Sequence, residues 1–215
     1  MSRPHPWRYV LALVAAIMLT AAPLRAETTA IDPAAQAPVT RLTDTLLATM
    51  KEADTLGFEG RYAKLDPVLH EVFDFRFMAR LSLGTHWRKL TDDQQGALVD
   101  AFARLSVSTF AARFDGYSGQ GFEVRDPRKG PNGTVLVPTH LTRPDKDAVT
   151  ISYLMRESDS DWNVIDIYMK GSYSEVASRR SEYTGIMKRE GFDSLLKRIR
   201  GKAEEVAGTH DHPWE

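Results

Sequence analysis

Apolar residues recur at helical spacing through the first half of the chain. One stripe predicts a helix from about Val39 to Gly57, and Asp66 before Pro67 predicts a second helix start, because proline fits the first turn of a helix. The inward positions of these two helices are Leu42, Leu46, Met50, Ala53, Val68, Leu69, Val72 and Phe73.

Two capping signals predict two more helices. Asp74 opens one that should end at Gly84, a typical C-terminal stop. The run Thr91-Asp92-Asp93-Gln94 matches a capping box, in which each side chain accepts a hydrogen bond from the other residue's backbone N–H. The long helix that follows should turn inward Leu98, Phe102, Leu105 and about Phe110.

After Gly116 the helical spacing gives way to alternation, which predicts strands at about 121–127, 134–143, 148–157 and 161–170. The joins GPNG, RPDKD and ESDSD are short and polar, so antiparallel hairpins are favoured over crossovers.

A second capping box, Ser172-Tyr173-Ser174-Glu175, predicts that Ser172 ends the last strand and begins a helix to about Lys188. Gly191 should interrupt this helix. A final amphipathic helix then has its inward positions at Phe192, Leu195, Leu196, Ile199 and Val206.

The order of these elements predicts an α+β domain with a helical N-terminal half, a four-stranded antiparallel meander and C-terminal helices. A twisted sheet of this size is curved, and helices laid across its concave face can enclose an apolar cavity.

The last strand is apolar on both faces. Strict alternation places Trp162, Val164, Asp166 and Tyr168 on one face and Asn163, Ile165, Ile167 and Met169 on the other. Each face therefore needs a partner. Helices from both ends of the chain could supply the two layers, or something else must fill the gap.

The N-terminus has the layout of a secretory signal. Arg3 and Arg8 precede an apolar run, Val10–Ala22, that is too short for a membrane span of about 20 residues. We expect cleavage after Ala26, with an uncleaved anchor as the alternative. The remaining chain is then a flexible leader at 27–37, a single domain at 38–207 and a disordered tail at 208–215, and it should work in the periplasm.

Charge and composition exclude several classes of function. Removing residues 1–26 takes away three arginines and no acid, so the net charge falls from −1 to −4, unlike that of a nucleic-acid binder. Cysteine is absent, which excludes disulfides and thiol chemistry. None of the six histidines has the spacing of an HExxH metal site, and GYSGQG has Gln120 where a hydrolase elbow needs glycine. We expect no catalytic residue, metal or cofactor; His210 and His212 suit a solvated tail better than a metal site.

Asp166 is the one candidate for acid–base chemistry. A carboxylate among apolar neighbours has a raised pKa and could act as a general base, together with Tyr168 or His140. The other interpretation is structural, with Asp166 paired to Arg179, Arg180 or a backbone N–H.

Two segments resemble the MlaC/Ttg2D (toluene tolerance) family. They are VFDFRFMARLSLGTHWRKLTDDQQGALVDAFARL, residues 72–105, and WNVIDIYMKGSYSEVASRRSEY, residues 162–183. The second matches the family's W-x-V-x-D and R-x-E/Q-aromatic pattern, although GSYS departs from the usual G-x-S. SEVASRRSEY resembles the hopanoid-associated HpnM branch more than the phospholipid branch.

The resemblance implies a soluble periplasmic lipid carrier and no enzyme. Members of the family take phospholipid between an outer-membrane complex, with a lipoprotein or porin, and an inner-membrane ABC transporter with an MCE-domain protein. The implied cargo here is a phospholipid or a hopanoid. An acid–base enzyme that uses Asp166 and an adaptor that binds other proteins remain the alternatives.

A carrier has to enclose its lipid, because about 14 methylenes at about 0.8 kcal/mol each contribute roughly 11 kcal/mol only when they leave water. Either Ile165, Ile167 and Met169 or the opposite face of the last strand should form one wall. The other expected wall residues are Phe75, Met78, Leu98, Phe102, Leu105, Leu136, Ile151 and Tyr153.

Overall fold

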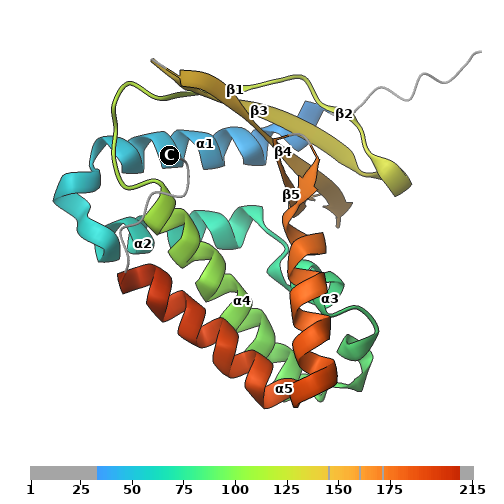
Figure 1. Cartoon of the computed structure of the whole chain (residues 1–215). Helices are drawn as coiled ribbons and strands as arrows, with labels where there is room; N and C mark the ends of the chain where they lie inside the picture. Colours follow the sequence, from blue (N-terminus) through green and yellow to red (C-terminus); the bar gives the residue numbers. More distant parts are fainter. Residues whose placement is uncertain (1–32, 145, 160, 171, 209–215) are drawn as a thin grey trace, which may run out of the picture. The chain divides into compact units, whose positions relative to one another are not determined.

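Helices on either side of a sheet-forming segment give the α+β arrangement in a computed structural model of the chain, which describes residues 33–144, 146–159, 161–170 and 172–208 (Figure 1). This confirms the predicted fold class. The helices are η1 (Pro33–Ala35), α1 (Gln36–Lys51), α2 (Ala53–Val72), α3 (Phe75–Leu83), η2 (Gly84–Lys89), α4 (Asp92–Arg113), η3 (Pro131–Gly133) and α5 (Glu175–Gly208), of which the η elements are 3-10 helices.

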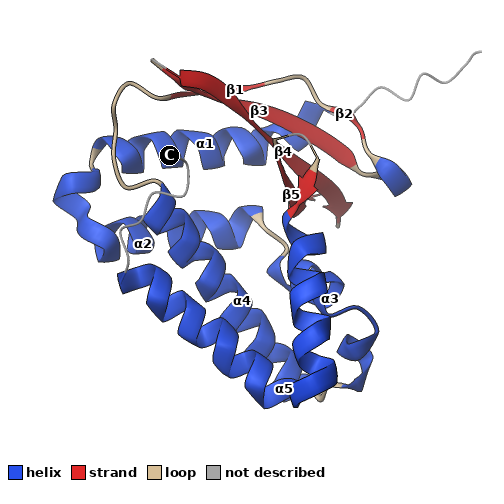
Figure 2. Cartoon of the chain, in the orientation of Figure 1, coloured by secondary structure: helices blue, strands red, loops and turns tan. Residues whose placement is uncertain are grey.

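The strands form one antiparallel sheet in the order β1-β3-β4-β5-β6, with β2 also paired to β3 (Figure 2). Four of them are the predicted meander, and two short strands extend it. Their bounds are β1 (Gly121–Val124), β2 (Arg128–Lys129), β3 (Val135–Arg143), β4 (Lys146–Ser158), β5 (Asp161–Met169) and β6 (Tyr173–Ser174).

Local capping fixes the ends of α3 and α4 as expected. Asp74 Oδ1 accepts from the N–H of Phe77 at 2.8 Å, and Gly84 closes α3 at φ 58°. Thr91 and Gln94 form the capping box of α4. Each device depends on residues within four positions of one another, which explains why the sequence alone reveals it.

Several helix boundaries differ from the prediction. The first helix, expected to reach Gly57, ends at Lys51. Pro67 lies inside α2 rather than at a start, because the break comes earlier, at Gly57, and the fully buried Leu65 and Leu69 hold the helix together across the proline. Residues 33–37, expected in a flexible leader, form η1 and the start of α1, since Ala35 is fully buried. The expected signal, the rest of the leader and tail residues 209–215 lie outside the described residues.

The start of α5 is shifted from Ser172 to Ser174. The N–H of Ala177 donates to Ser174 Oγ at 2.9 Å, which is the N-cap bond, and Tyr173–Ser174 first pairs with β5 as β6. The predicted interruption at Gly191 is confirmed, because its φ of 83° and ψ of −176° are not helical. The two segments of α5 run in different directions from this point (Figure 1).

A β-bulge at Ile165 changes the faces of β5. Met155 pairs with Val164 and Tyr153 pairs with Ile167, so two steps along β4 match three along β5. Val164, Ile167 and Met169 therefore share a face, and the expected grouping of Ile165 with Ile167 is wrong. Alternation predicts faces only where no residue is inserted.

The two faces of β4 and β5 are covered differently. On the face with Tyr153 and Val164, the side chains join the main hydrophobic core with α1, α2 and α4. On the opposite face, Arg156 forms an ion pair with Asp74 and lies over the Phe77 ring of α3 at 4.1 Å. The start of α3 therefore covers part of the second face.

Candidate functional site

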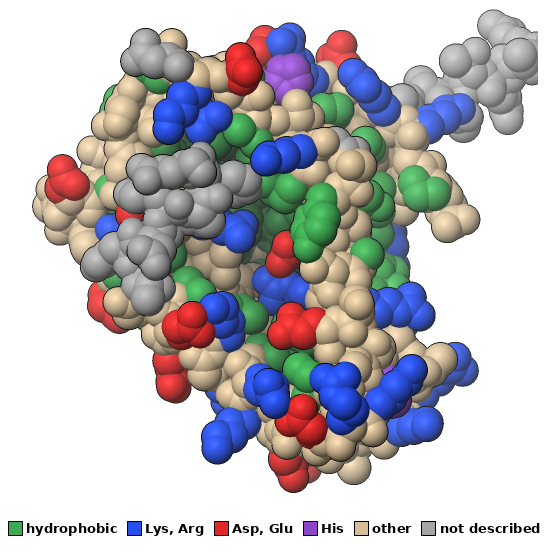
Figure 3. Space-filling model, in the orientation of Figure 1, with side chains coloured by type: hydrophobic (Ala, Val, Ile, Leu, Met, Phe, Trp, Pro, Cys, Tyr) green, Lys and Arg blue, Asp and Glu red, His purple; other side chains and the backbone are tan. Residues whose placement is uncertain are grey.

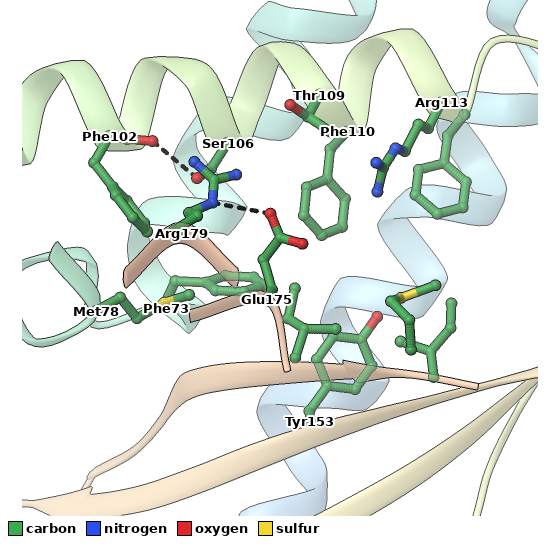
Figure 4. A pocket seen from close by; sticks show the side chains of 14 residues that line it. Phe73, Met78, Phe102, Ser106, Thr109, Phe110, Arg113, Tyr153, Glu175 and Arg179 are labelled. Carbon is green, nitrogen blue, oxygen red and sulfur yellow. Dashed lines mark hydrogen bonds and ion pairs between the residues drawn. The ribbon is translucent and has the colours of Figure 1, made fainter. Parts of the chain in front are cut away.

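The face of the sheet that carries Tyr153 forms, with α4, a small apolar cavity of about 50 Å³ (Figure 4). The stripe of α4 that faces the strands forms one wall, β4 and β5 form the opposite wall, and the start of α5 closes one side. The lining residues are Phe73, Met78, Phe102, Ser106, Thr109, Phe110, Arg113, Phe114, Ile151, Tyr153, Ile167, Met169, Glu175 and Arg179.

Six of the eleven predicted wall residues line this cavity. They are Met78, Phe102, Ile151, Tyr153, Ile167 and Met169. The other five lie elsewhere. Phe75 stacks on Phe73 just behind the wall, Leu98 is fully buried in the core, and Leu105 lines a neighbouring cleft. Leu136 is half-buried on the opposite face of β3, and Ile165 is buried at the bulge.

The polar part of the lining was not predicted from the sequence. Ser106, Thr109 and Arg113 continue the stripe of Phe102 along α4 at helical spacing, so that stripe was sufficient to find them. Glu175 and Arg179 are one turn apart at the start of α5. Their position follows from the placement of α5 against α4, which no local pattern encodes.

Aromatic rings form a continuous wall around the cavity. Phe73 lies 5.6 Å from Phe75 and 5.8 Å from Phe110, and Phe110 lies 5.8 Å from Phe114, measured between ring centroids. Phe102 extends the row through Phe75. These distances suit stacked and edge-to-face packing, which adds to the energy of burial and makes the wall stiff.

Four residues form a polar collar between this cavity and an outer cleft of about 670 Å³ that lies between α4 and the two segments of α5. We call Thr109, Arg113, Glu175 and Arg179 the collar, because all four line both spaces. Figure 3 shows this face of the molecule hollowed, with hydrophobic and charged side chains together inside the hollow.

The collar arginines are held in different ways. Arg179 Nε lies 2.9 Å from Glu175 Oε1, its Nη1 donates to Tyr183 Oη at 3.2 Å, and its guanidinium lies over the Phe102 ring. Burial opposes the charge of Arg179, but Tyr183 and Glu175 raise its pKa above the usual value. Burial lowers the pKa of Arg113, and the charge of Glu175 only partly offsets that effect. A negative group on a ligand would therefore be favoured at the collar.

The three hydroxyl groups that line the cavity differ in their hydrogen bonds. Ser106 Oγ donates to the Phe102 carbonyl at 2.8 Å and Thr109 Oγ1 donates to the Leu105 carbonyl at 2.7 Å. Tyr153 is only 1% exposed, and burial raises the pKa of its phenol well above the usual value. The phenol is therefore a neutral hydrogen-bond donor at any physiological pH.

Asp166 lies outside the cavity. Its carboxylate accepts from the N–H groups of Ile167 and Val176 at 2.8 and 3.0 Å and from Ser174 Oγ at 2.5 Å. Burial raises its pKa, although these three bonds oppose the shift. Of the two interpretations, the structure supports the pairing with backbone N–H groups. Tyr168 and His140, like Asp166, are not among the residues that line the cavity.

Neither a metal-binding cluster nor a membrane-spanning helix is found among the described residues. No three His, Cys, Asp or Glu side chains of residues 33–208, outside the three single gaps, are placed to hold a metal ion. His210 and His212 fall beyond that range. In the same part of the chain no helix is both long and apolar enough to cross a membrane.

Comparisons with known proteins agree with this architecture. No curated protein matches the chain. A solved structure of a phospholipid-binding protein from Ralstonia solanacearum, in complex with a phospholipid, is similar over 80% of this chain and 98% of its own, with a TM-score of 0.70 and 22% sequence identity. The family profile described as MlaC protein matches residues 40–201. Because that match spans most of the sequence, the chain belongs to the MlaC family.

Proposed function

We propose that this protein is a non-enzymatic lipid carrier of the periplasm. The observation that carries the proposal is the aromatic-walled cavity, which opens through a polar collar into a wider cleft. The apolar lining of the first space suits a hydrocarbon chain, and the charged lining of the second suits a polar head group. Membership of the MlaC family and the fold shared with a phospholipid-binding protein support it.

The cargo is a phospholipid or a hopanoid-type lipid, and the collar favours the phospholipid. The collar carries two arginines and one glutamate, so it suits a phosphate better than a neutral polycycle. The Asp166 carboxylate is already bonded by three donors outside the cavity, which argues against the alternative of an acid–base enzyme.

The transport route follows from family membership alone. We infer that residues 1–26 direct export, and that the protein exchanges lipid with an inner-membrane ABC transporter with an MCE-domain protein and with an outer-membrane lipoprotein or porin complex. Membership of the MlaC family supports these partners.

The inner cavity has to enlarge to admit an acyl chain. A space of about 50 Å³ holds only about three or four water molecules. Met78 and Met169 are unbranched wall residues that can change rotamer at low cost, and the outer cleft lies next to the collar. Lipid entry therefore requires that wall side chains, α4 or the start of α5 move.

The direct test is to extract protein purified from a lipid-rich host with organic solvent and identify bound molecules by mass spectrometry. About one lipid per protein is expected. A folded protein that carries no lipid, and takes none up from vesicles, would rule out the carrier.

A pair of tryptophan variants tests the location of the chain. Ile167→Trp fills the cavity and should lower lipid uptake from vesicles at least tenfold. Ile165→Trp, two residues along the same strand, should leave uptake unchanged and lower the free energy of unfolding by about 1–3 kcal/mol through overpacking. Equal lipid uptake by both variants would show that the acyl chain does not bind in this cavity.

A further inference from the structure

The Tyr153 hydroxyl is the one lining hydroxyl that no hydrogen bond within the described residues satisfies. Figure 4 shows it directed away from β4 into the space under α4. The hydroxyl is not one of the enclosed side-chain atoms that lack a partner, so it is accessible from the cavity that it lines. Tyr153 can therefore donate to an acceptor on a molecule that occupies the cavity.

The surroundings of Tyr153 define what that acceptor can be. Its neighbours along the sheet wall, Ile151, Ile167 and Met169, are apolar, whereas the acceptors of Ser106, Thr109 and Glu175 lie on α4 and α5. A ligand that lies between these walls can supply the acceptor. The collar, where a charged head group fits, borders the same small space. An acceptor at this place lies between the head group and the apolar chain. In a glycerolipid, that position belongs to the ester carbonyl.

We propose that Tyr153 donates a hydrogen bond to an acyl-ester carbonyl of the bound lipid, and so selects ester lipids over ether lipids of the same shape. The proposal rests on the lipid-carrier function and adds a chemical class of ligand to it. The protein would then distinguish an ester linkage from an ether linkage, independently of the chain length and head group of the lipid.

The test compares dipalmitoyl phosphatidylglycerol with its dihexadecyl ether analogue, which has the same head group and chains but no carbonyl. Wild-type protein should bind the ester about three- to tenfold more tightly, which is the range for one net hydrogen bond. Tyr153→Phe, which removes only the hydroxyl, should bind both lipids with equal affinity. Tyr168→Phe is the matched control, since Tyr168 lies one residue from Met169 on the same strand but outside the cavity, and it should keep the ester preference.

A spectroscopic readout supplements the affinities. With an isotope-labelled ester carbonyl, the infrared band of the bound lipid should lie at lower frequency in wild type than in Tyr153→Phe, because a hydrogen bond weakens the C=O bond. This measurement, and the wild-type preference itself, stay informative even if Tyr153→Phe folds poorly.

Each outcome decides one question. Equal binding of both lipids by wild type, or tighter binding of both by Tyr153→Phe, would overturn the role of Tyr153 and leave the carrier intact. If neither lipid binds to wild type, the phospholipid-carrier function itself fails.

Discussion

The Asp166 carboxylate connects strand β5 to helix α5. One oxygen accepts from the N–H groups of Ile167 and Val176, and the other accepts from Ser174 Oγ, which in turn caps α5 through Ala177. The residue directly before Asp166 is the inserted residue of the bulge, so a single side chain holds both the irregular strand and the first turn of the helix.

Replacing Asp166 by Ala should lower the free energy of unfolding by about 1–3 kcal/mol, because buried donors lose their acceptor. The loss should be larger near pH 4.5 than at pH 7. The folded protein has the raised pKa, so it binds this proton more tightly than the unfolded chain does, and the contribution of Asp166 falls as pH rises from about 4 through the raised value.

Urea unfolding of wild type and Asp166→Ala at the two pH values measures this difference, since all other titrating groups are shared by the two proteins. A loss that grows with pH would mean that the three hydrogen bonds, and not burial, dominate the pKa of Asp166.

At the scale of elements, Gly191 sets the angle between the two segments of α5. Its backbone conformation is open almost only to glycine, yet a Cβ at this position would touch nothing within 4 Å. The requirement for glycine is therefore conformational and not steric. Gly201, in the second segment, has equally open surroundings without the left-handed φ.

This pair makes a matched experiment. Gly191→Ala should lower the free energy of unfolding by about 1–3 kcal/mol through backbone strain, whereas Gly201→Ala should raise it by up to about 1 kcal/mol through helix propensity. Thermal or urea unfolding gives both values. If the two variants have equal stability, the backbone at residue 191 is not under the expected constraint.

These elements also indicate what the sequence could predict. Asp74, Gly84, Thr91 and Gly191 act through bonds or angles within a few residues, and each of these boundaries is where local patterns place it. Packing decides the others. Pro67 stays in a helix because Leu65 and Leu69 are buried against distant elements.

The candidate site divides in the same way. Apolar wall residues such as Met78 and Tyr153 were predictable because burial follows periodicity. The bulge at Ile165 arises from pairing with β4, so the sequence of β5 alone does not predict it. Glu175 lines the cavity from the first turn of α5, which is capped by Ser174 and not by Ser172. The sequence spacing of such polar residues is the same whether they line a cavity or lie on a solvent-exposed face of a helix.

On the scale of the whole molecule, lipid binding under the carrier proposal should be visible as stability. A ligand that binds only the folded state adds about 4 kcal/mol at a thousandfold excess over Kd. For a domain of this size each kcal/mol raises Tm by about 2–4 °C, so loading should raise Tm by about 10 °C.

Differential scanning calorimetry of lipid-stripped and reloaded protein measures this shift, with Ile167→Trp as a control that should not respond to added lipid. Identical melting of stripped and reloaded wild-type protein would contradict lipid binding inside the fold.

The small volume of the inner cavity has a consequence for timing. A chain larger than the closed space can escape only while the surrounding walls are apart, so residence time is set by how often the walls separate when that step is the slow one. Two lipids with different affinities for the open form would then leave at similar rates. A membrane partner that held the walls apart would speed lipid release without competing for the lipid. The rate of lipid transfer would then depend on the opening of the cavity and not on the affinity for the lipid.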